Sequence, residues 1–261
     1  MNASSESARQ GRRHCLFCPS PANSIEHVWP AWVLRRLRRP NISGVEGEQA
    51  GRRVRWSGID PAVRARCVCR DCNHGWLSAL ETTAQPIIGA LIQDIAVSLD
   101  REQQAIAAAW AAKMSMMIEA TRGASSGLFY SQHQREAFRS HGALPLGSTV
   151  WLGRYVGGKY AFLDCADGSH ASGDGARPAS AYVSTFVAGR LAFQVLSIRL
   201  GPEHSGFRGP SIPQSARPWD EATVQIWPTE RVAVGWPPRR SFSDRAEPSL
   251  ETLTRRWTAD C

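Results

Sequence analysis

Two pairs of cysteines, each spaced C-x2-C, leave the N-terminal part of this chain little choice in how it folds. The first pair is Cys15 and Cys18, and the second is Cys69 and Cys72. Each pair can present two thiolates to one tetrahedral ion, so the two pairs supply the four ligands of a structural zinc site. Five of the seven cysteines lie in the first third of the chain, which favours a metal site over a disulfide framework. We therefore expect structural Zn²⁺ to be bound by these four cysteines.

Two further residues beside these pairs could also bind metal. Cys67 could replace a ligand through a Cys67-x-Cys69 arrangement, and His14 directly precedes Cys15. The C-x2-C spacing gives the better ligand geometry, and four thiolates complete the coordination of zinc. We expect Cys67 to lie on a strand as a small apolar residue and His14 to be a neighbour of the site.

The segments around the cysteines predict a small zinc-bound fold. Residues 62–68 are typical of a strand, and residues 31–39 of a short basic helix after Pro30. Residues 73–81 have helical spacing, with Trp76 and Leu80 one turn apart on the same face. A cysteine pair, a β-hairpin and a helix that carries the second pair make a treble clef. We expect this finger to span residues 12–82.

The stretch between the two cysteine pairs contains the sequence SIEHVWP. Glu26-His27, followed by an apolar residue, one further residue and Pro30, resembles the (D/E)-H-(I/V)-x-P signature that opens the HNH, or His-Me finger, endonucleases. The order C-x2-C, E-H, C-x2-C-N is similar to the zinc-stapled branch of that superfamily, which includes McrA-like enzymes and the recombination endonuclease VII type. The resemblance covers residues 12 to 82, under a third of the chain.

The resemblance implies a ββα-metal finger with a catalytic site beside the structural zinc. In that branch the acidic residue and the residue after the last cysteine hold a second, catalytic divalent ion, which makes Glu26 and Asn73 its ligands here. His27 is then the general base, since a neutral imidazole can take a proton from water near pH 7. Oxygen ligands favour Mg²⁺ or Mn²⁺. The implied function is hydrolysis of phosphodiester bonds in DNA.

Several positions leave alternatives open. Glu26 stands where the pattern more often has Asp. The middle Asn, which orients the histidine, has no evident counterpart, so Asp60, Asn41 or a backbone carbonyl could take that role. Asn73 could instead be the N-terminal cap of its helix, and His74 is a second candidate for the metal ligand. A finger in which Glu26 and His27 serve only structure would be a non-catalytic module that binds nucleic acid or a protein.

Positive charge is concentrated in the same part of the chain. Residues 1–80 contain 13 Arg and 6 acidic residues, which accounts for +7 of the net charge of +8. A small basic module is typical of a protein that binds a polyanion, and nucleic acid is the commonest one. We therefore expect DNA as the partner. One active centre per chain cuts one strand, so a double-strand break would require a homodimer or two encounters.

The remaining residues predict a helical segment over 83–145 and a β-rich segment over 146–261, so the fold class is α+β. Helical spacing continues through residues 86–99, a capping box at Asp100 to Gln103 opens a helix over residues 101–122, and Ser131 caps a helix that ends near Gly142. An antiparallel meander is expected from strands at residues 148–155, 159–165, 181–188 and 191–200, with tight turns at 157–158 and 189–190. Residues 166–178 and 201–219 are typical of loops, and residues 249–257 of a short final helix.

The chain shows no segment typical of secretion or membrane insertion. Its first residues are polar and then basic, and no later apolar run approaches the length of a bilayer span. We expect a cytoplasmic protein without a membrane partner. Only two of its 31 basic residues are lysine, Lys113 and Lys159.

Overall fold

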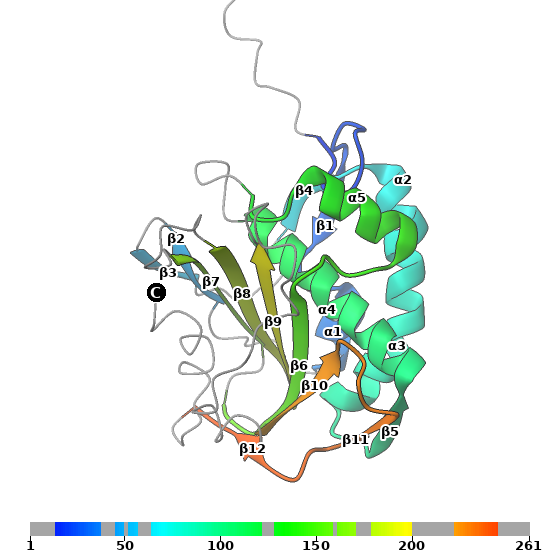
Figure 1. Ribbon diagram of the computed structural model, residues 1–261, viewed down its shortest axis with the longest axis vertical. Coiled ribbons are helices and arrows are strands. Elements are labelled where there is room, and N and C mark those ends of the chain that lie inside the picture. The colour runs from blue at the N-terminus through cyan, green and yellow to red at the C-terminus, as the bar shows by residue number, and fades with distance from the viewer. Residues whose placement is uncertain are drawn as a thin grey trace, which may run out of the picture.

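The computed structural model describes residues 14–37, 45–49, 52–56, 64–121, 128–158, 161–170, 179–199 and 222–244. These residues form an α+β structure with antiparallel sheets, as the sequence predicts, and one short pair of strands that is parallel (Figure 1). In chain order the elements are β1 (Ser24–His27), α1 (Ala31–Arg36), β2 (Val45–Gln49), β3 (Arg52–Trp56), β4 (Arg64–Val68), α2 (Arg70–Cys72), η1 (Asn73–Leu77), α3 (Ser78–Ile92), β5 (Val97–Asp100), α4 (Arg101–Thr121), α5 (Gln132–His141), β6 (Ser148–Tyr155), β7 (Ala161–His170), β8 (Ala179–Ala188), β9 (Leu191–Arg199), β10 (Thr223–Trp227), β11 (Ala233–Trp236) and β12 (Ser241–Phe242).

The largest sheet has the strand order β10-β6-β9-β8-β7, and the short strand β12 pairs in parallel with the end of β6. Strands β7, β8 and β9 form the expected meander. The predicted tight turn between β6 and β7 is wrong, because β6 pairs with β9 and two strands separate it from β7. Gly157 and Gly158 instead form a bend beside Asp244, whose carboxylate accepts a hydrogen bond from the Gly158 N–H at 2.8 Å.

Helix α4 is the central helix of the structure and lies between the large sheet and α3 (Figure 1). Its capping box is confirmed: the Gln103 N–H donates to Asp100 Oδ1 at 2.8 Å, and the Asp100 N–H donates to Gln103 Oε1 at 3.1 Å. A helix that is apolar on nearly all sides is expected in the interior of a protein. The side chains that the sequence places on the apolar face are all buried: Ala107, Ala108, Trp110, Ala111, Met114, Met117 and Ile118.

The segment before α4 differs from the prediction of a helix over residues 86–99. Helix α3 continues past Pro86 but ends at Ile92, and Asp94 has a left-handed backbone with φ of 61°. Residues Val97–Asp100 then form β5, which pairs antiparallel with β11. The partner strand lies more than 130 residues later in the chain, so no local periodicity could predict this pairing.

The N-terminal part is built on the pair β1 and β4, with the hairpin of β2 and β3 inserted between them in the sequence. The predicted strand at 62–68 corresponds to β4, and the predicted basic helix to α1, whose expected last residues lie outside the described part. Strand β7 extends to His170, so residues 166–170, predicted as part of a loop, lie on a strand instead. Residues 171–178, the loop at 201–219 and the helix at 249–257 fall outside the described residues.

No helix in the described part of the chain is both long and apolar enough to cross a membrane.

The helix predicted after Ser131 is confirmed as α5, with a capping box between Ser131 and Gln134 and a left-handed Gly142 after its last residue.

Candidate functional site

Four cysteine side chains converge at one end of the molecule. The sulfurs of Cys15, Cys18, Cys69 and Cys72 all lie within 4.8 Å of one another. The Cys18 sulfur lies 3.5 Å from that of Cys69 and 3.7 Å from that of Cys72. Four sulfurs at a tetrahedral Zn²⁺ would be about 3.8 Å apart, given Zn–S bonds of about 2.3 Å. All four side chains are buried. This buried group of four cysteines could hold a metal ion such as zinc.

Local backbone hydrogen bonds shape the loops that carry these thiols. The Cys15 N–H donates to the Ser20 carbonyl at 2.7 Å, which closes the first loop, and the Leu16 N–H donates to the Cys67 carbonyl at 2.7 Å, which ties this loop to β4. Cys69 is the N-terminal cap of α2, since the Cys72 N–H donates to its sulfur at 3.3 Å. Backbone N–H groups aimed at sulfur favour the thiolate form that binds metal.

Burial and contacts within the cluster give Cys15, Cys18 and Cys72 different pKa values. Burial raises the pKa of Cys15 and, together with the hydrogen bond to Cys69 and the charge at Cys15, raises that of Cys72. Burial would raise the pKa of Cys18 as well, but hydrogen bonds from Ser20 and the neighbouring thiols lower it to about 7. Four adjacent thiolates repel one another, so a divalent cation is the species that would allow all four to ionise together.

Helix α5 packs against the first cysteine loop. The Arg135 guanidinium is buried, and its Nε donates to the Leu16 carbonyl at 2.8 Å. The Trp76 ring lies edge-on to both Phe17 and Phe138, with ring centroids 4.8 Å and 5.7 Å away. The cysteine cluster therefore lies beneath a shell that residues from the middle of the chain complete.

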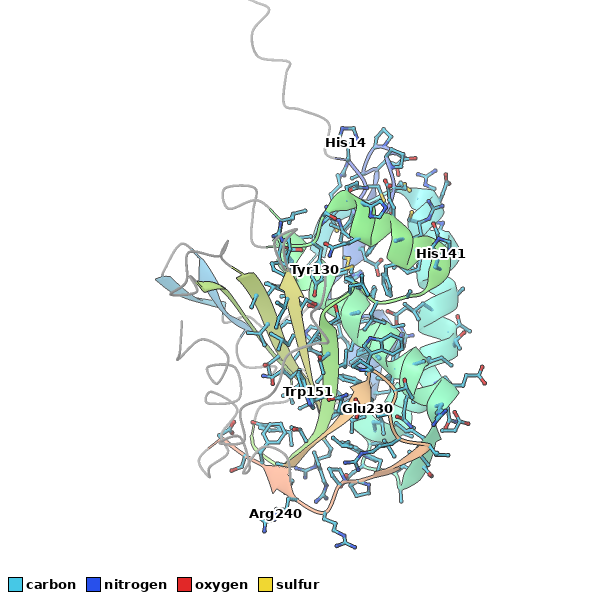
Figure 2. All side chains as sticks on the ribbon, in the orientation of Figure 1. His14, Tyr130, His141, Trp151, Glu230 and Arg240 are labelled. Atoms are coloured by element: carbon cyan, nitrogen blue, oxygen red, sulfur yellow. The ribbon has the colours of Figure 1, made fainter. Side chains whose placement is uncertain are left out.

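The other candidate metal ligands in this region do not join the cluster. The Cys67 thiol lies 3.9 Å from the sulfur of Met117 on α4, as expected for an apolar residue of a strand. His14 is exposed, with its Nδ1 at 3.2 Å from the Pro19 carbonyl oxygen, and Figure 2 shows it at the outer end of the N-terminal loop. His74 is exposed. Among the described residues, only the four cysteines form a group of three or more metal-ligating side chains.

Asn73 connects the segment after the last cysteine with β1. Its Nδ2 donates to Ser24 Oγ at 2.8 Å and to the Ile25 carbonyl at 3.5 Å. The alternative in which Asn73 caps the helix is wrong, because the helix already begins at Arg70 and Cys69 is its cap. The Asn73 side chain thus lies beside the strand that carries Glu26 and His27.

Glu26 belongs to a buried ionic cluster that the sequence did not reveal. The Lys113 ammonium on α4 lies 3.5 Å from Glu26 Oε1 and 2.9 Å from Glu81 Oε1. Glu81 Oε2 accepts hydrogen bonds from the Trp32 indole at 2.6 Å and from the Trp110 indole at 3.0 Å. Burial lowers the pKa of Lys113, but the charges of Glu81 and Glu26 outweigh it and raise the pKa above its ordinary value. Lys113 is therefore an ammonium at neutral pH.

His27 is half-buried at the end of β1, and its register partner on β4 is Arg64. Within the described part of the chain, its imidazole makes no hydrogen bond to another side chain or to a backbone carbonyl. Asn41 and Asp60, the candidates for orienting the imidazole, both lie outside the described residues.

One signal in the sequence could have pointed to the ionic cluster. Lys113 is the only charged residue inside the stretch AIAAAWAAKMSMMI. A buried charge requires an opposite charge or several hydrogen bonds, so a lysine on an apolar helix predicts a buried carboxylate nearby. The sequence does not tell which carboxylates these are, because Glu26 and Glu81 lie on other elements.

Comparisons with known proteins give no assignment for this site. No family model, curated protein or solved structure matches the chain.

Proposed function

We propose that this chain is a metal-dependent endonuclease of the HNH type that hydrolyses phosphodiester bonds in DNA, with a structural zinc bound by its four cysteines. The observation that carries the proposal is the contact between Asn73 and β1, in which Asn73 Nδ2 lies 2.8 Å from Ser24 Oγ. This contact brings the residue after the last cysteine beside the strand of Glu26 and His27. These are the residue types and the neighbourhood that the HNH pattern requires.

The arrangement around the cysteines supports a treble-clef ββα finger. The first cysteine loop is followed by β1, which pairs antiparallel with β4, and the second cysteine pair opens the helices α2 and η1. The hairpin of β2 and β3 is an insertion between the paired strands. The buried cluster of four cysteines would fix the first loop against the start of α2, and so keep Asn73 beside β1.

The donor atoms near β1 suit a hard divalent cation. Within the described residues, Glu26 Oε2 and Asn73 Oδ1 have no hydrogen-bond partner, and carboxylate and amide oxygens are ligands that Mg²⁺ and Mn²⁺ prefer. A divalent ion held there would polarise the scissile phosphate and stabilise the leaving 3′ oxygen. His27 would accept the proton of the attacking water, which requires the neutral imidazole.

Charge supports nucleic acid as the substrate class. Arg35, Arg66 and Arg70 are exposed, and they lie on α1, β4 and α2, three elements of the finger that carries Glu26 and His27. Arginine recognises phosphate through a planar fork of N–H donors. Exposed arginines on the finger would bind the DNA backbone and make binding fall steeply with salt concentration.

The nuclease proposal is tested by nicking of supercoiled plasmid with Mg²⁺ or Mn²⁺. We expect the unaltered protein to nick and His27→Ala to lose at least about a hundredfold in rate, because general-base catalysis contributes about 10²- to 10⁴-fold. His141→Ala is the matched control, since it removes an exposed imidazole on α5, outside the finger. Both variants should retain the zinc content of the unaltered protein. Nicking by His27→Ala at an undiminished rate would remove His27 from the mechanism.

A second function is favoured by the ion pair between Glu26 and Lys113, whose closest atoms lie 3.5 Å apart. An ammonium beside Glu26 already provides a positive charge to its carboxylate, so Glu26 could be a structural ion-pair partner that binds no cation. The finger would then be a non-catalytic zinc module that binds nucleic acid. In that case neither the unaltered protein nor His27→Ala would nick the plasmid, and both would bind DNA with the same steep dependence on salt.

A further inference from the structure

The ionic cluster of Lys113, Glu26 and Glu81 contains more negative charge than the lysine needs. Lys113 is completely buried, and each carboxylate side chain is 15% exposed. One carboxylate suffices to neutralise an ammonium, and Glu81 is the nearer one, with Oε1 at 2.9 Å. Burying a charge costs several kcal/mol before any pairing. The contact with Glu26 is therefore an additional feature that neutralisation alone does not explain.

Glu81 fixes the position of the lysine. Both of its oxygens are engaged, because Oε1 accepts from Lys113 and Oε2 accepts from the indoles of Trp32 and Trp110. These partners come from α1 and α4, so Glu81 is held from two sides by rigid elements. Because Glu81 is fixed in this way, the ammonium bound to it has little freedom to move with Glu26. The contact between Lys113 and Glu26 therefore restrains the Glu26 side chain.

Glu26 has one oxygen within reach of the ammonium and a longer side chain than the aspartate more common in the HNH pattern. Lys113 lies 3.5 Å from Oε1, and within the described residues Oε2 has no partner. The extra methylene of glutamate adds one rotatable bond, and the freedom of rotation about this bond is lost when the carboxylate binds a metal. A fixed cation at Oε1 would restrain that bond beforehand and leave Oε2 available.

We propose that Lys113 is a positioning residue of the endonuclease site, which holds the carboxylate of Glu26 in place for a divalent cation. This inference rests on the function proposed above. Lys113 lies 87 residues after Glu26, on a helix outside the finger of residues 12–82. The site of the finger is thus completed by α4, and this assigns a task to a part of the chain that carries no motif of its own.

The test measures Mn²⁺ binding directly, by electron paramagnetic resonance of the zinc-loaded full-length protein, together with Mn²⁺-dependent nicking. Lys113→Met removes the charge and keeps an unbranched side chain that is only one atom shorter. Partners that orient a metal ligand typically contribute 10- to 100-fold to metal affinity. We therefore expect Lys113→Met to bind Mn²⁺ about 10- to 100-fold more weakly, and to require correspondingly more Mn²⁺ for half-maximal nicking.

Three further variants distinguish positioning from a purely structural role. Ser115→Ala, a change at another buried residue of α4, should leave the Mn²⁺ affinity unchanged. Lys113→Met added to Glu26→Gln should cause no further loss of Mn²⁺ affinity, because Lys113 acts through Glu26. Lys113→Arg keeps the charge and so protects folding; it should bind Mn²⁺ more weakly than the unaltered protein and more tightly than Lys113→Met.

The outcomes separate the two proposals. An unaltered protein that neither binds Mn²⁺ nor nicks DNA overturns the endonuclease, and the role of Lys113 with it. If the unaltered protein nicks, but Lys113→Met binds Mn²⁺ equally well or more tightly, only the positioning role is wrong, because the ammonium would then merely repel the cation. If Lys113→Met does not fold, Lys113→Gln removes the charge in its place, and an Mn²⁺ affinity of Lys113→Gln equal to or above that of the unaltered protein overturns the positioning role in the same way.

Discussion

Cys69 combines two tasks in the cysteine cluster, since its sulfur accepts the Cys72 N–H as the cap of α2 and lies 3.5 Å from the Cys18 sulfur. We expect Cys69→Ser to lose stoichiometric zinc and to unfold the N-terminal finger. Binding of structural zinc contributes on the order of 10 kcal/mol to small zinc-dependent folds, far more than a serine could replace. Zinc content per chain and the thermal unfolding curve measure both effects.

Cys67→Ser is the control for this prediction. Its thiol lies 3.9 Å from the Met117 sulfur and outside the cluster, so this variant should keep one zinc per chain. A Cys69→Ser protein with full zinc content and unchanged unfolding would rule out the four-thiolate site. Equal loss of zinc in both variants would point instead to a general loss of folding.

The cysteine ligands could be predicted from the sequence because their geometry is mostly local. Each C-x2-C pair places two thiols on one loop, and only the meeting of the two loops depends on the rest of the fold. The partners of Glu26 are different: Lys113 and Glu81 come from two helices that lie far from β1 in the sequence. Such a cluster depends on tertiary packing, which no short motif records.

Helix α5 stabilises the first cysteine loop from outside the finger, mainly through Arg135. This side chain is buried, and its Nε donates to the Leu16 carbonyl at 2.8 Å, while another guanidinium nitrogen donates to the Tyr130 carbonyl. Arg135→Leu would leave these carbonyls without a donor. An unpaired buried polar group costs about 1–3 kcal/mol, so we expect a loss of that size in unfolding free energy and faster release of zinc to a chelator.

Arg139→Leu provides the comparison for this prediction, because Arg139 is exposed on the same helix. An exposed substitution typically changes stability by less than about 0.5 kcal/mol. Urea unfolding and the rate of zinc transfer to a chelator should therefore separate the two variants. If zinc release is equally fast in both, α5 does not hold the cysteine loop.

The elements that the sequence predicted correctly are those with strong local signals. Helices α4 and α5 begin at capping boxes, at Asp100 and Ser131, where side chains satisfy free N–H groups of the first turn. The pairing of β5 with β11 and of β6 with β9 could not be predicted in this way, because strand partners are chosen by burial across the whole sheet.

Most of the buried apolar residues in the described part form one continuous core that includes the cysteine cluster, and two smaller groups around Tyr155 and Trp151 lie apart from it. Buried apolar side chains are in contact from Cys15 through α4 to Trp236 on β11. The division into segments at residues 83 and 146 stays a prediction. The shared core means that a change in the sheet can reach the finger through α4, whose residues contact both.

A buried hydroxyl network in this core predicts how the stability of the whole molecule depends on pH. Figure 2 shows Tyr130 beside the end of the large sheet, where its hydroxyl lies 3.2 Å from Ser115 Oγ on α4 and 2.9 Å from Ser197 Oγ on β9. Burial raises the pKa of Tyr130 to about 12, although the two hydrogen bonds lower it in part. The folded protein therefore retains the phenolic proton at a pH at which the unfolded chain has lost it.

The free energy of unfolding should consequently decrease in alkaline solution. Below pH 10 Tyr130 is protonated in both the folded and the unfolded state, and its contribution to the free energy of unfolding is complete. Between about pH 10 and 12 only the folded state keeps this proton, so the contribution is lost as the pH rises. A difference between 10.0 and about 12 corresponds to roughly 3 kcal/mol. Lys113, whose pKa is also raised, changes stability in the same direction. Urea unfolding at about pH 8.5 and about pH 11, followed by tryptophan fluorescence, should show this decrease in the free energy of unfolding. The decrease should be smaller in Tyr130→Phe. An equal decrease in both proteins would mean that Tyr130 is not its source.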